Sequence, residues 1–268
     1  MEKTDIAFKR EQKFDTSDRG ILLFLRCRKK SLGEWPSLKD STLSGEESRR
    51  IRIYFGTSDG KFSEQGDDVQ RLRLTRYVGS DKDSDKKFDY FFEIKHERQG
   101  ENGREVGKVR IPLFQIRDLA RFLSGEKLEP NFDFPKGDGL VYCPDDLNPQ
   151  KWEEKRQYIF REIGKNRLVA LAASSYTRVS RDGHERDYRI TGDYDIAFAD
   201  LRGLMFSFEN LENLFDLQGC GKEKIPKVIV EFKRDFPEED LPAIRARYSM
   251  QSYPSKFDDI WGRLLKGK

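Results

Sequence analysis

Histidine and cysteine are scarce in this chain, with two and three residues among 268. His96 and His184 leave little material for histidine-based metal binding or catalysis, and we expect both to be surface residues. Cys27, Cys143 and Cys220 are far apart, odd in number and form no Cys-x-x-Cys pair. This pattern argues against a disulfide framework and a structural zinc site. We therefore expect a reduced, cytoplasmic setting.

Long apolar runs are also missing. No segment approaches the roughly 18 consecutive apolar residues of a membrane-spanning helix, and residues 1–14 lack the apolar centre of a signal peptide. The net charge is only +3, from 51 basic and 48 acidic residues. Since nucleic-acid binders usually carry a larger basic excess, we expect no sequence-specific nucleic-acid partner. A strong positive field must come from segregation of the charges.

The 20 Phe and 10 Tyr residues are sufficient for a hydrophobic core, and the length suits one domain over residues 1–268. Strand-like alternation with a period of two occurs in both halves of the chain. The segments are 50–55, 70–77, 90–97, 107–111, 168–179, 187–195, 205–208 and 227–233. Helices are predicted at 114–123, 152–163, 236–247 and 257–265, and residues 126–149 are predicted to be an excursion rich in Pro, Gly and Asp.

Basic residues gather on one face of each predicted strand, because side chains two apart point the same way. Arg71 and Arg73 oppose Leu72 and Leu74, for example. For a single strand the commoner explanation is an open sheet with its polar face in water. The repetition in every strand, together with helices that need an apolar partner, favours a barrel with its charges inside. About eight strands is the number that closes around a narrow interior.

Cations inside such a barrel repel one another by roughly 3 kcal/mol per pair at about 6 Å and an effective dielectric constant near 20. Anions must therefore fill the interior to stabilise it. Arginine forks and lysine ammonium groups are suited to a polyphosphate or a nucleoside triphosphate. The sequence thus predicts a phosphate-binding barrel.

Short motifs occur in a consistent order along nearly the whole chain. They are Lys9-Arg10-Glu11-Gln12-Lys13-Phe14, Ile53-Tyr54-Phe55-Gly56-Thr57, Arg71-Leu72-Arg73, Phe92-Glu93-Ile94-Lys95, Lys108-Val109-Arg110, Tyr176-Thr177-Arg178, Arg189-Ile190-Thr191-Gly192-Asp193, Val230-Glu231-Phe232-Lys233 and Ser255-Lys256-Phe257. Each motif is weak alone, but together they resemble the VTC domain, the polyphosphate polymerase domain of the triphosphate tunnel metalloenzyme (CYTH-like) superfamily.

The resemblance implies an α+β fold in which a closed eight-stranded antiparallel β-barrel, the triphosphate tunnel, carries helices on its outside. It implies transfer of the γ-phosphate of ATP onto a polyphosphate chain, with Mn²⁺ or Mg²⁺ as cofactor. Two alternatives share the fold: a metal-dependent triphosphatase acting on inorganic, nucleotide or RNA 5′ triphosphates, and a non-catalytic polyphosphate sensor. A separate membrane protein is a further partner that the resemblance allows.

Transferred position by position, the resemblance assigns roles to named residues. The basic catalytic residues are Lys13, Arg71, Arg73, Lys95, Lys108, Arg178, Arg189 and Lys256. Phosphate-binding residues are Arg76, Arg110, Tyr176 and Lys233. Glu231 is the metal ligand. Glu11, Glu93 and Asp193 are either secondary ligands or ion-pair partners, and for Glu11 and Glu93 we favour the role of holding Lys13 and Lys95.

The chain departs from the family pattern at three places. Gly56 replaces an Asp, Thr75 and Arg76 lengthen the spacing between the paired arginines and Tyr77, and Tyr253 stands where the family has a lysine. The last change removes one expected cation from the tunnel.

Overall fold

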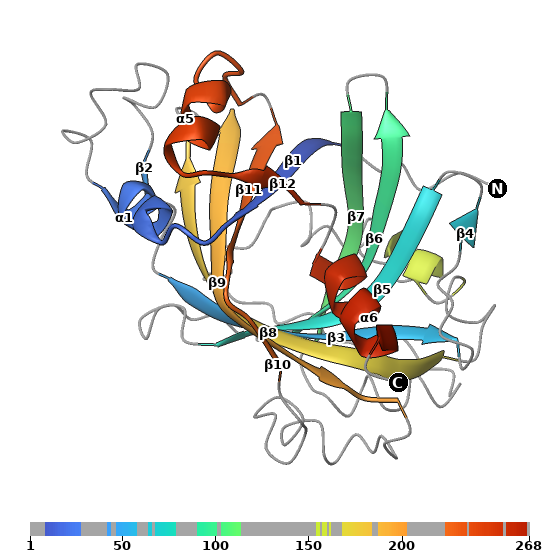
Figure 1. Ribbon diagram of the computed structural model, residues 1–268. Helices are drawn as coiled ribbons and strands as arrows, with labels where there is room; N and C mark the ends of the chain where they lie inside the picture. Colours follow the sequence, from blue (N-terminus) through green and yellow to red (C-terminus); the bar gives the residue numbers. More distant parts are fainter. Residues whose placement is uncertain are drawn as a thin grey trace.

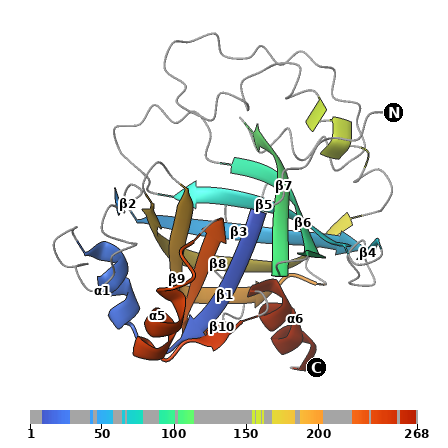
Figure 2. The same ribbon diagram turned by 90° about the horizontal axis from the view of Figure 1, so that it is seen from above.

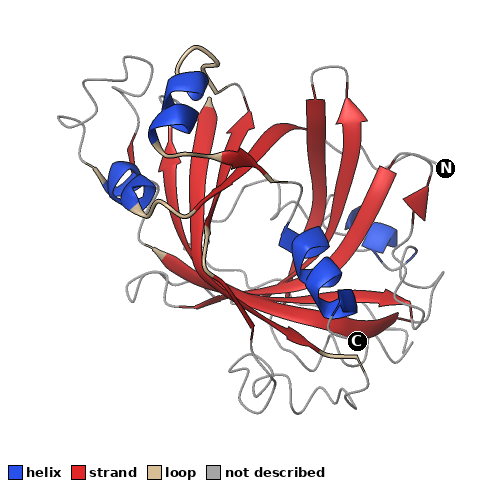
Figure 3. Ribbon diagram, viewed as in Figure 1, coloured by secondary structure: helices blue, strands red, loops and turns tan. Residues whose placement is uncertain are grey.

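The computed structural model describes residues 9–27, 42–43, 47–57, 64–65, 68–78, 90–100, 103–113, 154–155, 157–159, 161, 168–183, 187–202, 223–234, 236–253 and 256–266. Within these residues strands dominate, and Figure 3 shows them in red around a common interior.

Eight antiparallel strands form a closed β-barrel (Figure 1). In the order in which they pair, they are β1 (Lys9–Thr16), β7 (Gly103–Leu113), β6 (Tyr90–Gly100), β5 (Asp68–Val78), β3 (Ser48–Thr57), β8 (Leu168–Asp182), β9 (Tyr188–Asp200) and β11 (Val228–Arg234). β11 pairs again with β1 and so closes the ring. Short strands pair with β8, β9, β5 and β1: β2 (Thr42–Leu43), β10 (Glu223–Ile225), β4 (Glu64–Gln65) and β12 (Gln251–Ser252).

Closure confirms the predicted barrel and excludes the open sheet. The first-half meander of β3, β5, β6 and β7 is joined to the second half at two seams, β3 with β8 and β7 with β1. Because every barrel strand pairs on both sides, the barrel has no free edge. One face of each strand is therefore enclosed in the lumen, as we call the barrel interior.

The outer face of one half of the barrel is apolar and is covered by two helices. α1 (Gly20–Arg26) and α5 (Leu241–Arg247) lie outside β9 and β11 in Figure 2. Leu25 and Ile244 from these helices join Phe14, Val230 and Phe232 in one buried cluster. Burial of this apolar surface leaves the polar faces of the same strands to line the lumen.

The third helix packs differently from the prediction of helices on the outside. α6 (Lys256–Lys266) places Ile260 and Leu264 against Tyr54, Tyr176 and Ile229. These three residues share strand faces with residues that line the lumen, such as Arg52, Arg178 and Glu231. α6 therefore packs on lumen-facing side chains and brings Lys256 into the barrel.

Seven of the predicted strands lie within β3, β5, β6, β7, β8, β9 and β11, and the predicted helix 257–265 lies within α6. The predicted helix 236–247 begins only at Leu241. A helix from 236 would place Pro242 in its interior, where the ring clashes with the preceding turn, whereas the first turn tolerates proline. α1 and the four short strands were not predicted.

Residues 154–155, 157–159 and 161 are helical, in agreement with the predicted helix 152–163. The predicted helix 114–123, the excursion 126–149 and the strand 205–208 lie outside the described residues. Among the described helices, none has the length and hydropathy of a membrane span.

Candidate functional site

The lumen contains a cavity lined almost entirely by charged side chains, which we call the lumen site. Its residues are Glu11, Lys13, Arg52, Tyr54, Arg71, Arg73, Lys95, Glu97, Lys108, Arg178, Glu231, Lys233 and Lys256. They come from seven of the eight barrel strands and from α6. The remaining space is about 30 Å³, room for one or two water molecules. In this state the side chains themselves fill the lumen.

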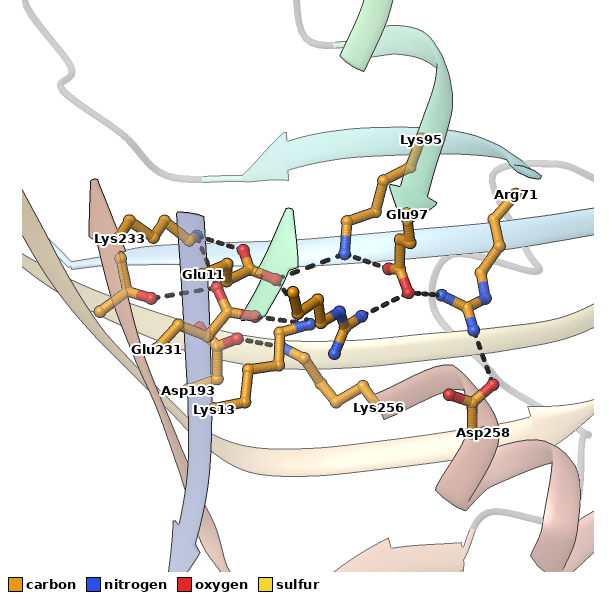
Figure 4. A network of polar contacts seen from close by, with 12 residues as sticks. Glu11, Lys13, Arg71, Lys95, Glu97, Asp193, Glu231, Lys233, Lys256 and Asp258 are labelled. Atoms are coloured by element: carbon orange, nitrogen blue, oxygen red, sulfur yellow. Dashed lines mark hydrogen bonds and ion pairs between the residues drawn. The ribbon is translucent and has the colours of Figure 1, made fainter. Parts of the chain in front are cut away.

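Glu11 and Glu231, on the neighbouring strands β1 and β11, bind three lysines (Figure 4). The Nζ of Lys13 lies 3.0 Å from Glu11 Oε1 and 3.5 Å from Glu231 Oε1. The Nζ of Lys233 lies 2.5 Å from Glu231 Oε2 and 3.7 Å from Glu11 Oε2. Lys95 from β6 approaches Glu11 at 3.5 Å. The two carboxylates and three ammonium groups thus alternate in one cluster.

Glu97 holds a second group of cations, on the other side of Lys95 in Figure 4. Its carboxylate pairs with Lys95, Arg71 and Arg104. Arg71 also donates to Asp258 Oδ1 of α6 over 2.7 Å. This ion pair connects β5 to α6, so that α6 supplies charge to the lumen site as well as apolar contacts.

Two further carboxylates lie behind the lining cations. Asp193 of β9 is fully buried. Its two carboxylate oxygens accept hydrogen bonds from Nε and Nη2 of Arg178, each at 2.5 Å. It also pairs with Lys256. Glu93 of β6 accepts from Arg73 Nε at 2.7 Å and from Thr75 at 2.9 Å. Arg178 and Arg73 are therefore fixed in orientation by partners that do not line the cavity.

Burial and ion pairing shift the pKa values of the side chains in the lumen site. Burial opposes ionisation of Glu11, but Lys13 and Lys95 hold the pKa of that carboxyl well below its usual value. For Glu231 too, burial is outweighed by Lys233 and Arg178, and its pKa is strongly lowered. Burial lowers the pKa of Lys95 to about 7, although Glu11 opposes the shift. The carboxylates are thus firmly ionised while Lys95 titrates near neutrality.

Positive charge exceeds negative charge in the lumen site. Nine cations and three carboxylates line the cavity. Glu93, Asp193 and Asp258 are the further carboxylates that contact lining cations among the described residues. With every lysine protonated, nine cations therefore face six carboxylates, which leaves an excess of three positive charges. A cavity of this kind attracts a polyanion.

Most of the predicted site residues come together here. Those that line the cavity are Glu11, Lys13, Arg71, Arg73, Lys95, Lys108, Arg178, Glu231, Lys233 and Lys256. Tyr176 lies beside them, with Lys256 Nζ 3.8 Å from its ring centroid. Arg110 is on the same strand face as Lys108, with its guanidinium 5.0 Å from the ring centroid of Phe91.

Three predicted basic residues do not line the cavity: Arg110, Arg189 and Arg76. Arg189 pairs with Asp182 near the start of β9. Arg76 is opposite Ile51 and on the strand face of Leu72 and Leu74, because it is an odd number of residues from Arg71 and Arg73. Arg76 is thus on the strand face that points away from the lumen, and the phosphate-binding role predicted for it does not fit this position.

Two ion-pair predictions need comparison with the contacts. Glu11 does contact Lys13 and Lys95. Glu93 holds Arg73 and not Lys95, since the register places Glu93 directly opposite Arg73. Arg73, the cross-strand neighbour of Glu93, is therefore its ion-pair partner, and Lys95, two residues along the same strand, is not.

Sequence reasoning missed Arg52, Tyr54 and Glu97 as lining residues. The signal for Arg52 was present, because Arg50 and Arg52 alternate with Ile51 and Ile53 in the same way as the arginines of β5. For Glu97 the strand face was evident from Lys95, but its contacts with Arg71 and Arg104 depend on the pairing of β6 with β5 and β7.

His96 is buried, with 4 % of its surface exposed, and not on the surface as expected. Its Nε2 lies 3.0 Å from the hydroxyl of Tyr158 in the helical segment 157–159. His96 is on the strand face opposite to that of Lys95, so this contact belongs outside the lumen. His184 lies outside the described residues.

Tyr253 replaces the expected lysine and has a structural place. Its hydroxyl donates to Asp259 Oδ2 over 2.9 Å, and its backbone N–H donates to Lys13 O over 3.0 Å. The ring packs with Ile229 and Ile260. At this position the described structure has an apolar contact between β11 and α6 in place of a cation.

Comparisons with known proteins add little. No family model matches the sequence, and no curated protein matches it. Among solved structures, the chain is similar to the "PH1819 protein from Pyrococcus Horikoshii OT3" at 11% sequence identity, with 97% of this chain and 100% of that chain covered and a TM-score of 0.40. At that TM-score the likeness supports no argument about function.

Proposed function

We propose that the lumen site binds the phosphates of ATP and of a polyphosphate chain, and that the protein is a polyphosphate polymerase that transfers the γ-phosphate onto the chain. The observation that carries this proposal is the convergence of nine cations, with an excess of three positive charges, in one enclosed cavity. A phosphate chain supplies several negative charges in a row, which matches a charge excess spread over several strands.

Phosphoryl transfer needs positioned phosphates and neutralised charge more than covalent help from the protein. Asp193 holds Arg178 through Nε and Nη2, which fixes the guanidinium so that Nη1 can donate to a phosphate oxygen. Lys13 and Lys233 are held between Glu11 and Glu231. A phosphate chain enters by drawing these cations away from their carboxylates, since the free space is about 30 Å³.

A divalent metal fits part of this site. No group of three His, Cys, Asp or Glu side chains suited to a metal occurs among the described residues. Mg²⁺ and Mn²⁺ nevertheless bind through one or two carboxylates when substrate phosphates and water complete the shell. Glu231 and Glu11 supply that pair, and Glu11 Oε1 lies 3.0 Å from Lys13 Nζ and 3.5 Å from Lys95 Nζ, ammonium groups that a bound metal would displace. The bound metal would neutralise charge on the transferred phosphate.

A metal-dependent triphosphatase is the second candidate. The proximity of Glu11 and Glu231 favours it, because both carboxylates contact Lys13 and Lys233. With one carboxylate on a metal, the other would accept a hydrogen bond from an attacking water and orient it. The two activities differ only in whether the acceptor is a phosphate chain or water.

Incubation with ATP and Mn²⁺, followed by separation of the products by chain length, tests the proposal. A polymerase yields chains longer than three phosphates, and Glu231→Gln abolishes them. Glu105→Gln is the matched control, since that carboxylate pairs with Arg98 over 2.8 Å on the outer face, and it should retain activity.

Other products would reassign the function. Orthophosphate alone would identify a triphosphatase. A rise in melting temperature with polyphosphate but no turnover would identify a sensor. If ATP and polyphosphate neither react nor shift the melting temperature, the phosphate-binding proposal is wrong.

A further inference from the structure

Seven of the nine cations that line the cavity contact a carboxylate of the described residues within 4 Å. These are Lys13, Arg71, Arg73, Lys95, Arg178, Lys233 and Lys256. The two others, Arg52 and Lys108, have neither an ion pair nor a hydrogen bond with any residue in the described ranges. Two of the nine lining cations therefore have no carboxylate partner among the described residues.

Arg52 lies on β3 with 5 % of its surface exposed. Its guanidinium stacks 4.9 Å from the ring centroid of Tyr176, and its Nε has no hydrogen-bond partner. The N–H donors of a buried guanidinium normally have acceptors. Leaving a donor of a charged group without an acceptor costs more folding free energy than leaving a neutral donor unpaired. The lack of a partner indicates that an acceptor is missing.

Two hydroxyl groups beside Arg52 also lack partners. Ser174 is directly opposite Arg52 in the pairing of β3 with β8 and is fully buried, and its Oγ makes no hydrogen bond. The hydroxyl of Tyr176, two residues along the same strand face, has none either. Three buried donors on adjacent strands are therefore unsatisfied at one place.

Lys108 reaches the same cavity from β7. Its side chain is exposed to solvent. The charges of Arg73, Lys233 and Arg52 repel its ammonium group, while Glu93 attracts it. Arg52 thus acts electrostatically on Lys108, and an anion near both would remove their repulsion.

We propose that Arg52, Lys108, Ser174 and Tyr176 form a phosphate subsite that binds one phosphoryl group of the chain directly, without a metal ion. Glu93, the carboxylate that acts on both Lys108 and Arg52, is already bound to Arg73 and Thr75, so the described residues supply no free carboxylate here to hold a metal. The Glu11 and Glu231 side of the lumen site would take the metal-bound phosphates. This subsite rests on the proposed function.

The test is binding of tripolyphosphate in the presence of a chelator, measured by calorimetry, together with the melting temperature of the ligand-free protein. Arg52→Gln and Lys108→Gln should each weaken binding about tenfold or more. Arg52→Gln should leave the ligand-free melting temperature unchanged or higher, because it removes a buried charge without a counter-ion.

Arg181→Gln is the matched control. Arg181 is equally buried, but its guanidinium donates to the backbone oxygens of Leu25 and Cys27 at 3.1 and 2.8 Å, outside the lumen. This variant should lower the melting temperature and leave the affinity for tripolyphosphate unchanged.

The results of these binding and melting experiments distinguish failure of the proposed subsite from failure of the proposed function. If the unmodified protein binds tripolyphosphate and both Arg52→Gln and Lys108→Gln bind it equally well, the subsite is refuted and the proposed function stands. A melting temperature of Arg52→Gln as low as that of Arg181→Gln would show a structural role and also refute the subsite. Failure of the unmodified protein to bind tripolyphosphate, with or without Mg²⁺, refutes both.

Discussion

Lys95 is a lysine of the lumen site whose charge state can change near neutral pH. It lies between Glu11 and Glu97, and burial lowers its pKa to about 7. A bound phosphate adds negative charge next to the ammonium group and raises this pKa again. Binding therefore takes up a proton, and the affinity should fall as the pH rises above 7.

Proton uptake can be measured by calorimetry of tripolyphosphate binding at pH 7.5 in buffers of different ionisation enthalpy. Lys95→Arg keeps the charge but does not titrate in this range, so this variant should bind with less uptake of protons. Tripolyphosphate takes up the same number of protons with either protein, so the difference in proton uptake between the unmodified protein and Lys95→Arg measures the contribution of Lys95. Equal uptake by the variant and the unmodified protein would contradict the assignment.

For individual residues, the sequence predicted which strand face each side chain is on better than it predicted the ion-pair partner of each side chain. Arg71, Arg73 and Lys108 were placed correctly because alternation is a local property. Arg52 carried the same signal, but the motifs of the resembled family do not include it. The pairing of Glu93 with Arg73, and of Glu97 with three cations, depends on the strand register, which no local pattern determines.

Among the elements, α1 depends on a glycine in β9. A Cβ on Gly192 would lie 2.6 Å from Leu25 Cδ1 and 3.3 Å from both Leu22 Cδ2 and Val179 Cγ1. Leu25 is fully buried, so its side chain would have to shift against the neighbours in its cluster. Gly192→Ala should therefore reduce the free energy of unfolding by about 1–3 kcal/mol through overpacking, measured by urea denaturation.

The control for this substitution is on α6. A Cβ on Gly262 meets no atom within 4 Å, and alanine is preferred to glycine in a helix by about 1 kcal/mol. Gly262→Ala should stabilise the protein by up to that amount. If both substitutions destabilise it equally, close packing of α1 on β9 is not the cause.

Elements with strong alternation were predictable, and those that depend on packing were not. α1 has Ile21, Leu22, Phe24 and Leu25 buried within seven residues, which reads equally well as a short buried strand. The start of α5 was misjudged by five residues, although Pro242 gave a usable signal. β2, β4 and β12 have two residues each, too few for any period.

For the whole molecule, the buried carboxylates predict acid sensitivity. Burial is outweighed by Lys13 and Lys95 for Glu11, by Arg73 for Glu93 and by Lys95 for Glu97, and the pKa of each falls below its ordinary value of 4.5. A carboxyl with a lowered folded-state pKa contributes stability that is present above its unfolded-state pKa and is lost as the pH falls. Stability should therefore decrease steadily from about pH 5 downwards.

Urea denaturation between pH 7 and pH 3 measures this dependence. The slope below pH 4.5 should correspond to the uptake of several protons on unfolding, and Glu97→Gln should reduce it. A free energy of unfolding that stays constant from pH 7 to pH 3.5 would show that the lumen carboxylates do not stabilise the fold.

The sequence by itself determined which side chains share a strand face, because a period of two is set by the backbone alone. It therefore determined that arginine and lysine alternate with apolar residues in both halves of the chain. Only the tertiary structure decided that this face is enclosed, since closure depends on pairings between strands far apart in sequence, such as β1 with β11 and β3 with β8. The same pairings decided which cations obtain a carboxylate and which two, Arg52 and Lys108, do not among the described residues, because contacts across strands follow from register and not from local sequence.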